Sequence, residues 1–122
     1  MPKVTARSGR VKNFTDNLLN EKDFMESIVQ LARSTGWLVY HTYDSRRSEP
    51  GFPDLVMTKP KRLVIAEIKT EKGKTSKHQD KWLETLGTAR GVEVKVWRPS
   101  DWPEIERTLG AITQDSTKIR GT

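Results

Sequence analysis

The chain has 122 residues, enough for one compact domain with a single core and too few for two domains of ordinary size. It carries 22 Lys and Arg against 16 Asp and Glu, a formal net charge of +6, which favours a polyanionic partner such as nucleic acid, although a basic surface can also serve solubility alone. The absence of Cys excludes disulfides and thiolate metal sites, and the lack of a long apolar run argues against a membrane span, so we expect a soluble protein of the reducing cytoplasm.

The first predicted element is a helix that follows a basic arm. Residues 1–15 are basic and show almost no apolar periodicity, so we expect a flexible arm that can contact phosphates. Asn20 is suited to cap a helix that continues to about Gly36. Its apolar stripe consists of Phe24, Met25, Ile28, Val29, Leu31 and Ala32.

A strand and a hairpin are predicted next. Residues 37–43 are aromatic and β-branched, as is typical of a strand, and a polar loop follows them. Two further strands, 55–58 and 62–69, flank a short turn in which Pro60 favours the bend and cannot continue a central ladder. Three strands in a row therefore follow the first helix.

The C-terminal part is predicted to alternate helix and strand. Ser76 opens a second helix that ends near Gly91, a strand follows at 92–97, and Ser100 or Asp101 caps a short third helix. The apolar stripes of these helices are Trp82, Leu83, Leu86 and Ala89 in one, and Ile105 and Leu109 in the other.

The order of these elements is α-β-β-β-α-β-α, which predicts an α/β fold in which helices flank a mixed sheet. The folded domain is expected to span residues 16–110. Residues 111–122 are polar enough that we expect a disordered tail.

The strand at 62–69 carries the first candidate functional residues. Alternate side chains share a face, so Glu67 and Lys69 continue the apolar face of Leu63 and Ile65. A desolvated carboxylate or ammonium is costly unless it is partnered. The two charges therefore mark either a salt-bridged strand end that emerges into solvent or a functional site.

Asp54 favours the functional interpretation. It begins the preceding strand, and pairing about the turn brings it close to Glu67. Two carboxylates this close repel, and a divalent cation allows both to stay ionised. Oxygen-only ligands indicate Mg²⁺, with Mn²⁺ able to substitute, and the backbone carbonyl of Ile68 is a further candidate ligand.

Lys69 is a candidate catalytic residue. Its ammonium lies one strand repeat beyond Glu67, where it can orient an attacking water and offset charge that develops in the transition state. The metal would lower the pKa of that water. Together these groups supply what phosphodiester hydrolysis requires, so the sequence predicts a metal-dependent nuclease.

Each of the two longer helices adds one polar candidate. Glu21 shares the apolar face of the first helix and is a candidate third acid, although it can also merely favour the positive helix start, and Glu26 is a competitor. Gln79 shares the apolar face of the second helix. It is suited both to a role in the active site and to a capping box with Ser76, and the sequence does not decide between them.

Two basic clusters flank the predicted site. Arg46 and Arg47 precede the turn before Asp54, and Lys72 and Lys74 lie in the loop before the second helix. Individually such residues are usually just solvated. Their common placement around one pair of carboxylates predicts a rim that binds DNA phosphates.

Three motifs are familiar as a set. They are a Tyr40–Leu55 segment that ends in Gly-Phe-Pro-Asp-Leu, an Ala66–Thr70 segment that contains Glu-Ile-Lys, and a Ser76–Leu83 segment with a central Gln. Together they resemble the VRR-NUC family of the PD-(D/E)xK nuclease superfamily, and the resemblance runs from about Glu21 to Trp102. It implies a restriction-endonuclease-like core.

The resemblance also implies roles for individual residues. Asp54 and Glu67 would bind metal and Lys69 would be catalytic. Glu21 matches the glutamate near the start of the family's first helix, although Glu26 is close enough to serve, and Gln79 matches the glutamine of its second helix.

Small stand-alone members of the family are similar to phage-encoded proteins and to Holliday junction resolvases in fold and in dimeric habit. We therefore expect an Mg²⁺-dependent homodimeric endonuclease that selects branched DNA in a bacterial or phage-infected cytoplasm. The alternatives are a flap or generic DNA nuclease, a restriction-like enzyme that reads sequence, and a DNA-binding module without turnover.

Overall fold

The structure is a computed structural model, which describes residues 20–42 and 49–110. The predicted basic arm, the predicted tail and the predicted phosphate-binding residues Arg46 and Arg47 lie outside these residues. Within the described ranges, no helix combines the length and the apolar character that a membrane crossing requires.

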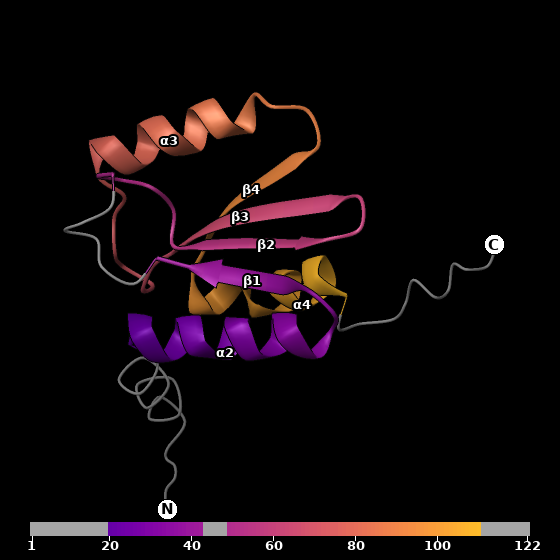
Figure 1. Cartoon of the computed structure of the whole chain (residues 1–122). Helices are drawn as coiled ribbons and strands as arrows, with labels where there is room; N and C mark the ends of the chain where they lie inside the picture. The colour runs from indigo at the N-terminus through magenta and orange to yellow at the C-terminus, as the bar shows by residue number, and fades with distance from the viewer. Residues whose placement is uncertain (1–19, 43–48, 111–122) are drawn as a thin grey trace, which may run out of the picture.

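A mixed sheet of four strands forms the centre of the fold, in the order β1-β2-β3-β4 (Figure 1). The first three strands pair antiparallel, and β4 pairs parallel to β3. A parallel pair needs a crossover connection, which α3 (Lys77–Gly87) provides. The strands are β1 (Leu38–His41), β2 (Leu55–Lys59), β3 (Arg62–Ile68) and β4 (Val92–Trp97).

Helices cover both faces of the sheet, so the fold has three layers. Helices α2 (Glu21–Ser34) and α4 (Trp102–Leu109) lie on one face, and α3 lies on the other (Figure 1). A short 3₁₀ turn, Pro99–Asp101, leads into α4. The predicted α/β class and the predicted order of elements are confirmed. The core between the sheet, α2 and α4 includes Phe24, Ile28, Leu55, Met57, Val64, Ala66, Ile68, Trp97, Ile105 and Leu109.

Helix α2 begins where the sequence predicts. Asn20 has an extended backbone, and its side-chain oxygen accepts a hydrogen bond from the Asp23 amide at 2.8 Å. This bond satisfies one of the amides that the first turn of a helix leaves open. The apolar stripe is buried at Phe24, Ile28, Val29 and Ala32. The cap and the stripe together fix the first turn of α2, and with it Glu21, at one edge of the sheet.

The hairpin of β2 and β3 turns through only two residues, because Lys59 already pairs with Arg62. Pro60 takes the first position of this turn and Lys61 the second, with a φ of 66°. A left-handed backbone favours Gly and costs other residues about 1–2 kcal/mol. The tight turn leaves one register for the whole hairpin.

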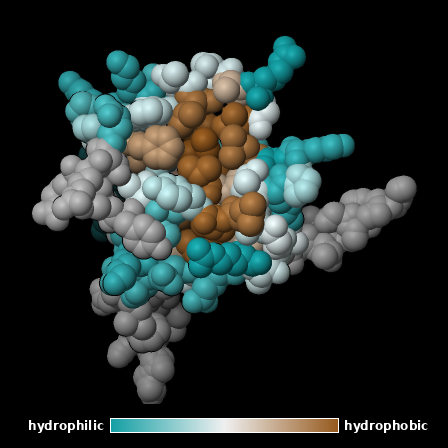
Figure 2. Space-filling view, viewed as in Figure 1, coloured by the Kyte–Doolittle hydropathy of each residue, from teal (hydrophilic) through white to brown (hydrophobic). Residues whose placement is uncertain are grey.

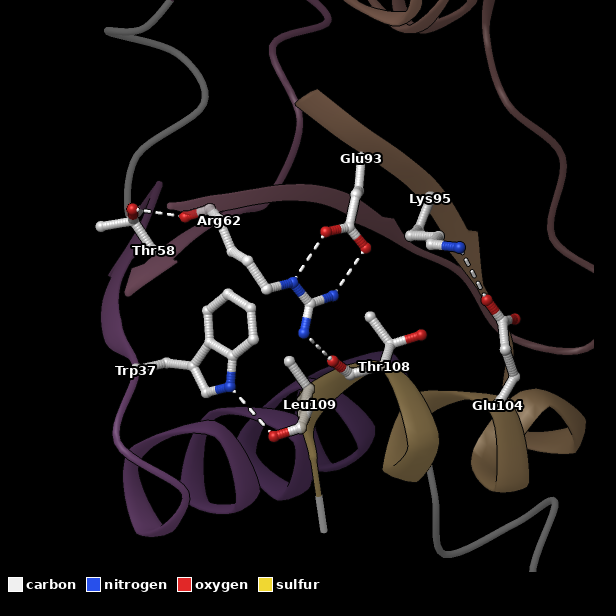
Figure 3. Close-up of polar contacts among 8 residues, drawn as sticks. All are labelled: Trp37, Thr58, Arg62, Glu93, Lys95, Glu104, Thr108 and Leu109. Atoms are coloured by element: carbon white, nitrogen blue, oxygen red, sulfur yellow. Dashed lines mark hydrogen bonds and ion pairs between the residues drawn. The ribbon is translucent and has the colours of Figure 1, made fainter. Parts of the chain in front are cut away.

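Polar contacts fasten α4 to the other end of the sheet (Figure 3). Arg62 Nε and Nη2 donate to the two carboxylate oxygens of Glu93 at 2.9 and 2.7 Å, and Nη1 donates to the Thr108 carbonyl at 2.9 Å. Trp37 Nε1 donates to the Leu109 carbonyl at 3.0 Å, and the Arg62 guanidinium lies 4.9 Å from a ring centroid of Trp37. The carbonyls at the end of α4 therefore receive side-chain partners.

Two predicted elements extend too far. The predicted strand 37–43 is β1, Leu38–His41, because the Trp37 amide still bonds to Ala32 of the helix and its ring packs into the core. The predicted helix end near Gly91 is wrong, since α3 ends at Gly87 and the exposed Ala89 lies beyond it. No residue of α3 is fully buried, because this helix lies mainly over β4.

Candidate active site

Four chain segments meet at one end of the central strands of the sheet. The start of β2, the end of β3 and the first turns of α2 and α3 all lie on the same side of the molecule (Figure 1). The hairpin register pairs Leu55 with Ala66, so the next pair outward is Asp54 and Glu67. Neighbours in an antiparallel pair share a face of the sheet. The predicted approach of the two carboxylates therefore follows from the observed register.

Asp54 is held through its backbone and its side chain. The Thr42 amide donates to the Asp54 carbonyl at 3.1 Å, which extends the β1–β2 pairing to this residue. Asp54 Oδ2 accepts a hydrogen bond from the Ile68 amide at 2.8 Å. The carboxylate is thus fixed against the end of β3. The carbonyl of Ile68 as a metal ligand stays a prediction.

Glu67 is the only buried charged residue in the described part of the chain, with 2% of its surface exposed. Its Oε2 accepts a hydrogen bond from Gln79 Nε2 at 2.8 Å and lies 3.6 Å from Lys69 Nζ. Its Oε1 is buried and receives no hydrogen bond from a donor among the described residues, so a hydrogen bond between Glu67 and the Asp54 carboxylate requires a proton on Glu67. Burial, with the negative charge of Asp54 adding to it and Lys69 opposing it, raises the pKa of Glu67 to about 8.

Glu21 rather than Glu26 belongs to this group of charges. The charges that act on Glu67 come from Asp54, Lys69 and Glu21. Partial burial and the neighbouring Asp54 raise the pKa of Glu21, and Lys69 acts in the opposite direction. Glu26 is exposed one and a half turns further along α2. The structure brings Glu21 to the site, and its chemical role stays a prediction.

Gln79 fills both of its predicted positions at once. Its backbone amide donates to Ser76 Oγ at 3.2 Å, and its Oε1 accepts from the Ser76 amide at 2.8 Å, which completes the capping box. Its Nε2 takes no part in the capping box and donates to Glu67 Oε2. The two ends of one amide therefore join the start of α3 to the buried carboxylate.

Lys72 and Lys74 are exposed in the loop between β3 and α3. Two contacts tie this loop to the segment after β4. Arg98 Nη2 donates to the Gly73 carbonyl, and the Ser100 amide donates to Glu71. The two lysines extend from a fixed loop next to the site, and phosphate binding by them stays a prediction.

The donor set fits a hard divalent cation with few protein ligands. Among residues 20–42 and 49–110, no group of three or more His, Asp or Glu side chains is arranged to hold a metal ion. The site instead offers the adjacent carboxylates of Asp54 and Glu67, and Glu67 Oε1 receives no hydrogen bond from a donor in the described part of the chain. Mg²⁺ commonly binds through one or two carboxylates and keeps several waters or substrate oxygens.

The sequence interpretation missed a contact between the loop before β2 and α3. The Phe52 and Trp82 rings meet edge to face at 5.1 Å, and Trp82 Nε1 donates to the Pro50 carbonyl at 3.1 Å. Gly51 has a φ of +87°, and a Cβ there would lie 2.5 Å from the His78 backbone. The glycine of the Gly-Phe-Pro motif was the available signal, since close approach of two backbones requires it.

These elements define the class of protein. The mixed sheet with helices on both faces is a fold of the PD-(D/E)xK type, and a carboxylate pair and a lysine lie at the open end of its β2–β3 hairpin. More particularly, the chain belongs to the VRR-NUC domain family, whose sequence model matches residues 5–101. A comparison with curated proteins found no match.

Similar solved structures include the following two. A protein described as a VRR_NUC domain protein superposes with a TM-score of 0.54 at 18% identity, covering 79% of this chain and 87% of that one. A Holliday junction resolvase, Hjc of Archaeoglobus fulgidus, gives a TM-score of 0.45 at 21% identity, covering 62% of this chain and 64% of the resolvase. The former likeness supports the fold.

Proposed function

We propose that the protein is a metal-dependent endonuclease that hydrolyses DNA phosphodiester bonds at Asp54, Glu67 and Lys69. One observation carries the proposal. Glu67 is buried beside a second carboxylate, and one of its oxygens receives no hydrogen bond from a donor in residues 20–42 and 49–110. This arrangement is unfavourable for an ionised carboxylate, and a divalent cation would relieve it. Membership in a nuclease family gives the reaction class.

Each residue of the site has a distinct role in this proposal. Asp54 and Glu67 would hold Mg²⁺ or Mn²⁺, which when bound supplies a water of lowered pKa and offsets phosphate charge. Lys69 orients the attacking water and stabilises negative charge in the transition state. Gln79 holds the Glu67 carboxylate in position through its 2.8 Å hydrogen bond. Glu21, whose charge acts on Glu67, would be the third acid of the site.

We propose further that the enzyme acts as a homodimer on branched DNA. The support is an apolar surface on edge strand β1, where Leu38 and Tyr40 are 74% and 62% exposed. On the same face of the sheet Tyr40 lies beside the half-buried Val56, and the row continues inward to the buried Ile65 and the half-buried Val94. Figure 2 shows a hydrophobic area over the strands, between α3 and α2.

A second copy is the occupant that suits this surface, because two identical strand edges and two identical apolar rows are self-complementary about a two-fold axis. The dimer would place two sites at a fixed separation, as the two-fold symmetry of a four-way junction demands. Phosphates of the DNA would be contacted, without base-specific contacts, by Lys72, Lys74, Arg46, Arg47 and the basic arm.

The decisive experiment compares cleavage of linear, flap and four-way DNA of equal length, with Mg²⁺ and with a chelator. We expect paired incisions on the four-way junction that require the metal. Asp54→Asn and Glu67→Gln should abolish cleavage, while the exposed Glu84→Gln on α3 serves as a matched control and should cleave normally.

The alternatives give different outcomes in the same assay. Equal cutting of all three substrates would indicate a generic nuclease, and preference for the flap would indicate a flap nuclease. Tight binding without cleavage in Mg²⁺ would favour a DNA-binding module. Undiminished cleavage by Asp54→Asn or Glu67→Gln would refute the proposed site.

A further inference from the structure

A pocket beside the carboxylate site is not used by the proposed hydrolysis. It has a volume of about 380 Å³ and lies between the loop before β2 and one face of α3. Its lining residues are Glu49, Pro50, His78, Lys81, Trp82 and Thr85. The last four follow the i, i+3, i+4, i+7 spacing of one helix face. The pocket therefore has one wall of helix and one wall of loop.

The aromatic wall of this pocket is fixed in orientation. Trp82 receives the edge-to-face contact of Phe52, and its indole N–H donates to the Pro50 carbonyl. Gly51 lets the loop backbone approach His78 so closely that any Cβ there would clash. An aromatic side chain that is already immobilised loses little entropy when a ligand stacks on it.

The pocket lies beside the proposed active site. His78, in its helical wall, is adjacent in sequence to Gln79, which bonds to Glu67. Pro50, in its loop wall, is four positions before Asp54 in the sequence, a span of at most roughly 14 Å. This proximity would let a nucleotide next to a phosphate bound at the carboxylates enter the pocket.

The chemistry of the lining selects the class of ligand. Trp82 offers an aromatic surface, Lys81 and the neighbouring Lys77 attract phosphates, and Glu49 and Thr85 offer hydrogen-bonding groups to base edges. An aromatic platform beside basic groups is how proteins hold bases of single-stranded nucleic acid. A base inside a duplex is stacked and paired, so only an unpaired base is available to enter.

We propose that this pocket binds an unpaired nucleobase next to the scissile phosphate, so that base capture contributes to selection of branched over linear DNA. The inference rests on the proposed nuclease function. The pocket would give the nuclease a recognition element inside a single subunit, whereas the dimer proposal places selectivity in the arrangement of two subunits.

The test measures DNA binding by the full chain in Ca²⁺, so that cleavage does not interfere, and compares two protein variants on matched DNA substrates. Affinity is measured for wild type and Trp82→Leu, on branched DNA with either normal or abasic nucleotides at the branch, and on linear duplex. We expect Trp82→Leu to weaken binding to the normal branch about tenfold, within the range for base–aromatic stacking. It should have no effect on the abasic branch or on the duplex.

A second variant keeps the outcome clear if Trp82→Leu disturbs the loop. Thr85→Phe fills the pocket from an exposed position and leaves the Phe52 and Pro50 contacts intact, so it should lose the same preference for the normal branch. Equal losses on normal, abasic and duplex DNA for both variants would overturn the pocket proposal.

The proposed function has a separate readout, cleavage of the same branched DNA in Mg²⁺ by wild type. If the wild type cleaves the DNA but Trp82→Leu changes affinity equally for the normal and the abasic branch, only the pocket proposal is refuted. If the wild type does not cleave but Trp82→Leu weakens binding to the normal branch alone, only the nuclease function is refuted, and the protein is a branch-binding module. Absence of DNA binding by wild type refutes both.

Discussion

Replacing Glu67 by Gln should stabilise the protein in the absence of divalent metal while abolishing its activity. Burial and the charge of Asp54 raise the pKa of Glu67 to about 8 from an ordinary 4.5. Between these pH values the folded state holds a proton that the unfolded chain has released. Stability of the wild type therefore falls as pH rises through this window. The side chain introduced by Glu67→Gln does not titrate. The stability that this variant gains over the wild type is therefore absent below the window and complete above it.

The expected magnitude follows from the same values. Near neutral pH, keeping a proton on a group of ordinary pKa 4.5 costs about 3 kcal/mol, at about 1.36 kcal/mol per pH unit. The amide introduced by Glu67→Gln can accept from Gln79 and donate toward Asp54, as the protonated acid does. We therefore expect a gain of about 1–3 kcal/mol, equivalent to at least about 5 °C in Tm for a domain of this size.

The assay is thermal unfolding of both proteins across the window, in chelator and in excess Mg²⁺. The control is Glu84→Gln, which removes an exposed glutamate and should match the wild type at every pH. Mg²⁺ should stabilise the wild type and not Glu67→Gln, because binding favours the ionised carboxylate. A gain in Tm that does not depend on pH, or none above the window, would refute the reasoning.

Four further outcomes are expected. Lys69→Ala should keep metal binding, measured by calorimetry, yet lose roughly 10²–10³ in cleavage rate; normal turnover would remove it from the mechanism. Mg²⁺ or Mn²⁺ should support cleavage and Ca²⁺ only binding, and full activity in chelator would contradict this. Lys61→Gly should raise stability by about 1 kcal/mol in denaturant titration, whereas a loss would show that the left-handed turn is unstrained. Leu38→Lys with Tyr40→Lys should halve the mass in light scattering, and an unchanged dimer would place the interface elsewhere.

The sequence predicts the centre of the site well because that part depends on short-range pattern. Alternation along β3 and a turn at Pro60 are sufficient to set the hairpin register, and the register alone brings Asp54 beside Glu67. The cap at Asn20 sets the phase of α2, which brings Glu21 to the site.

The remaining features depend on contacts that local pattern does not contain. The apolar stripe of α3 predicts a buried helix, but its residues stay partly exposed because the helix overlies mainly β4. The side-chain amide of Gln79 carries an acceptor oxygen and a donor nitrogen on the same carbon, and only the folded structure shows that the oxygen can bond to Ser76 while the nitrogen bonds to Glu67. The fixed position of Trp82 depends on a carbonyl 32 residues earlier in the chain.

The two-residue hairpin also affects how the protein folds. Its ends are close in sequence, so β2 and β3 can pair on the timescale of about 1–10 μs typical of hairpins, whereas the parallel β3–β4 pair must wait for the crossover through α3. We therefore expect Asp54 and Glu67 to come together before the hydrogen bond from Gln79 to Glu67 forms. Their mutual repulsion opposes this early step, so a divalent cation or mild acid should accelerate refolding as well as stabilise the folded state. Stopped-flow fluorescence of the four Trp residues would measure this acceleration, and Asp54→Asn should fold at the faster rate without either.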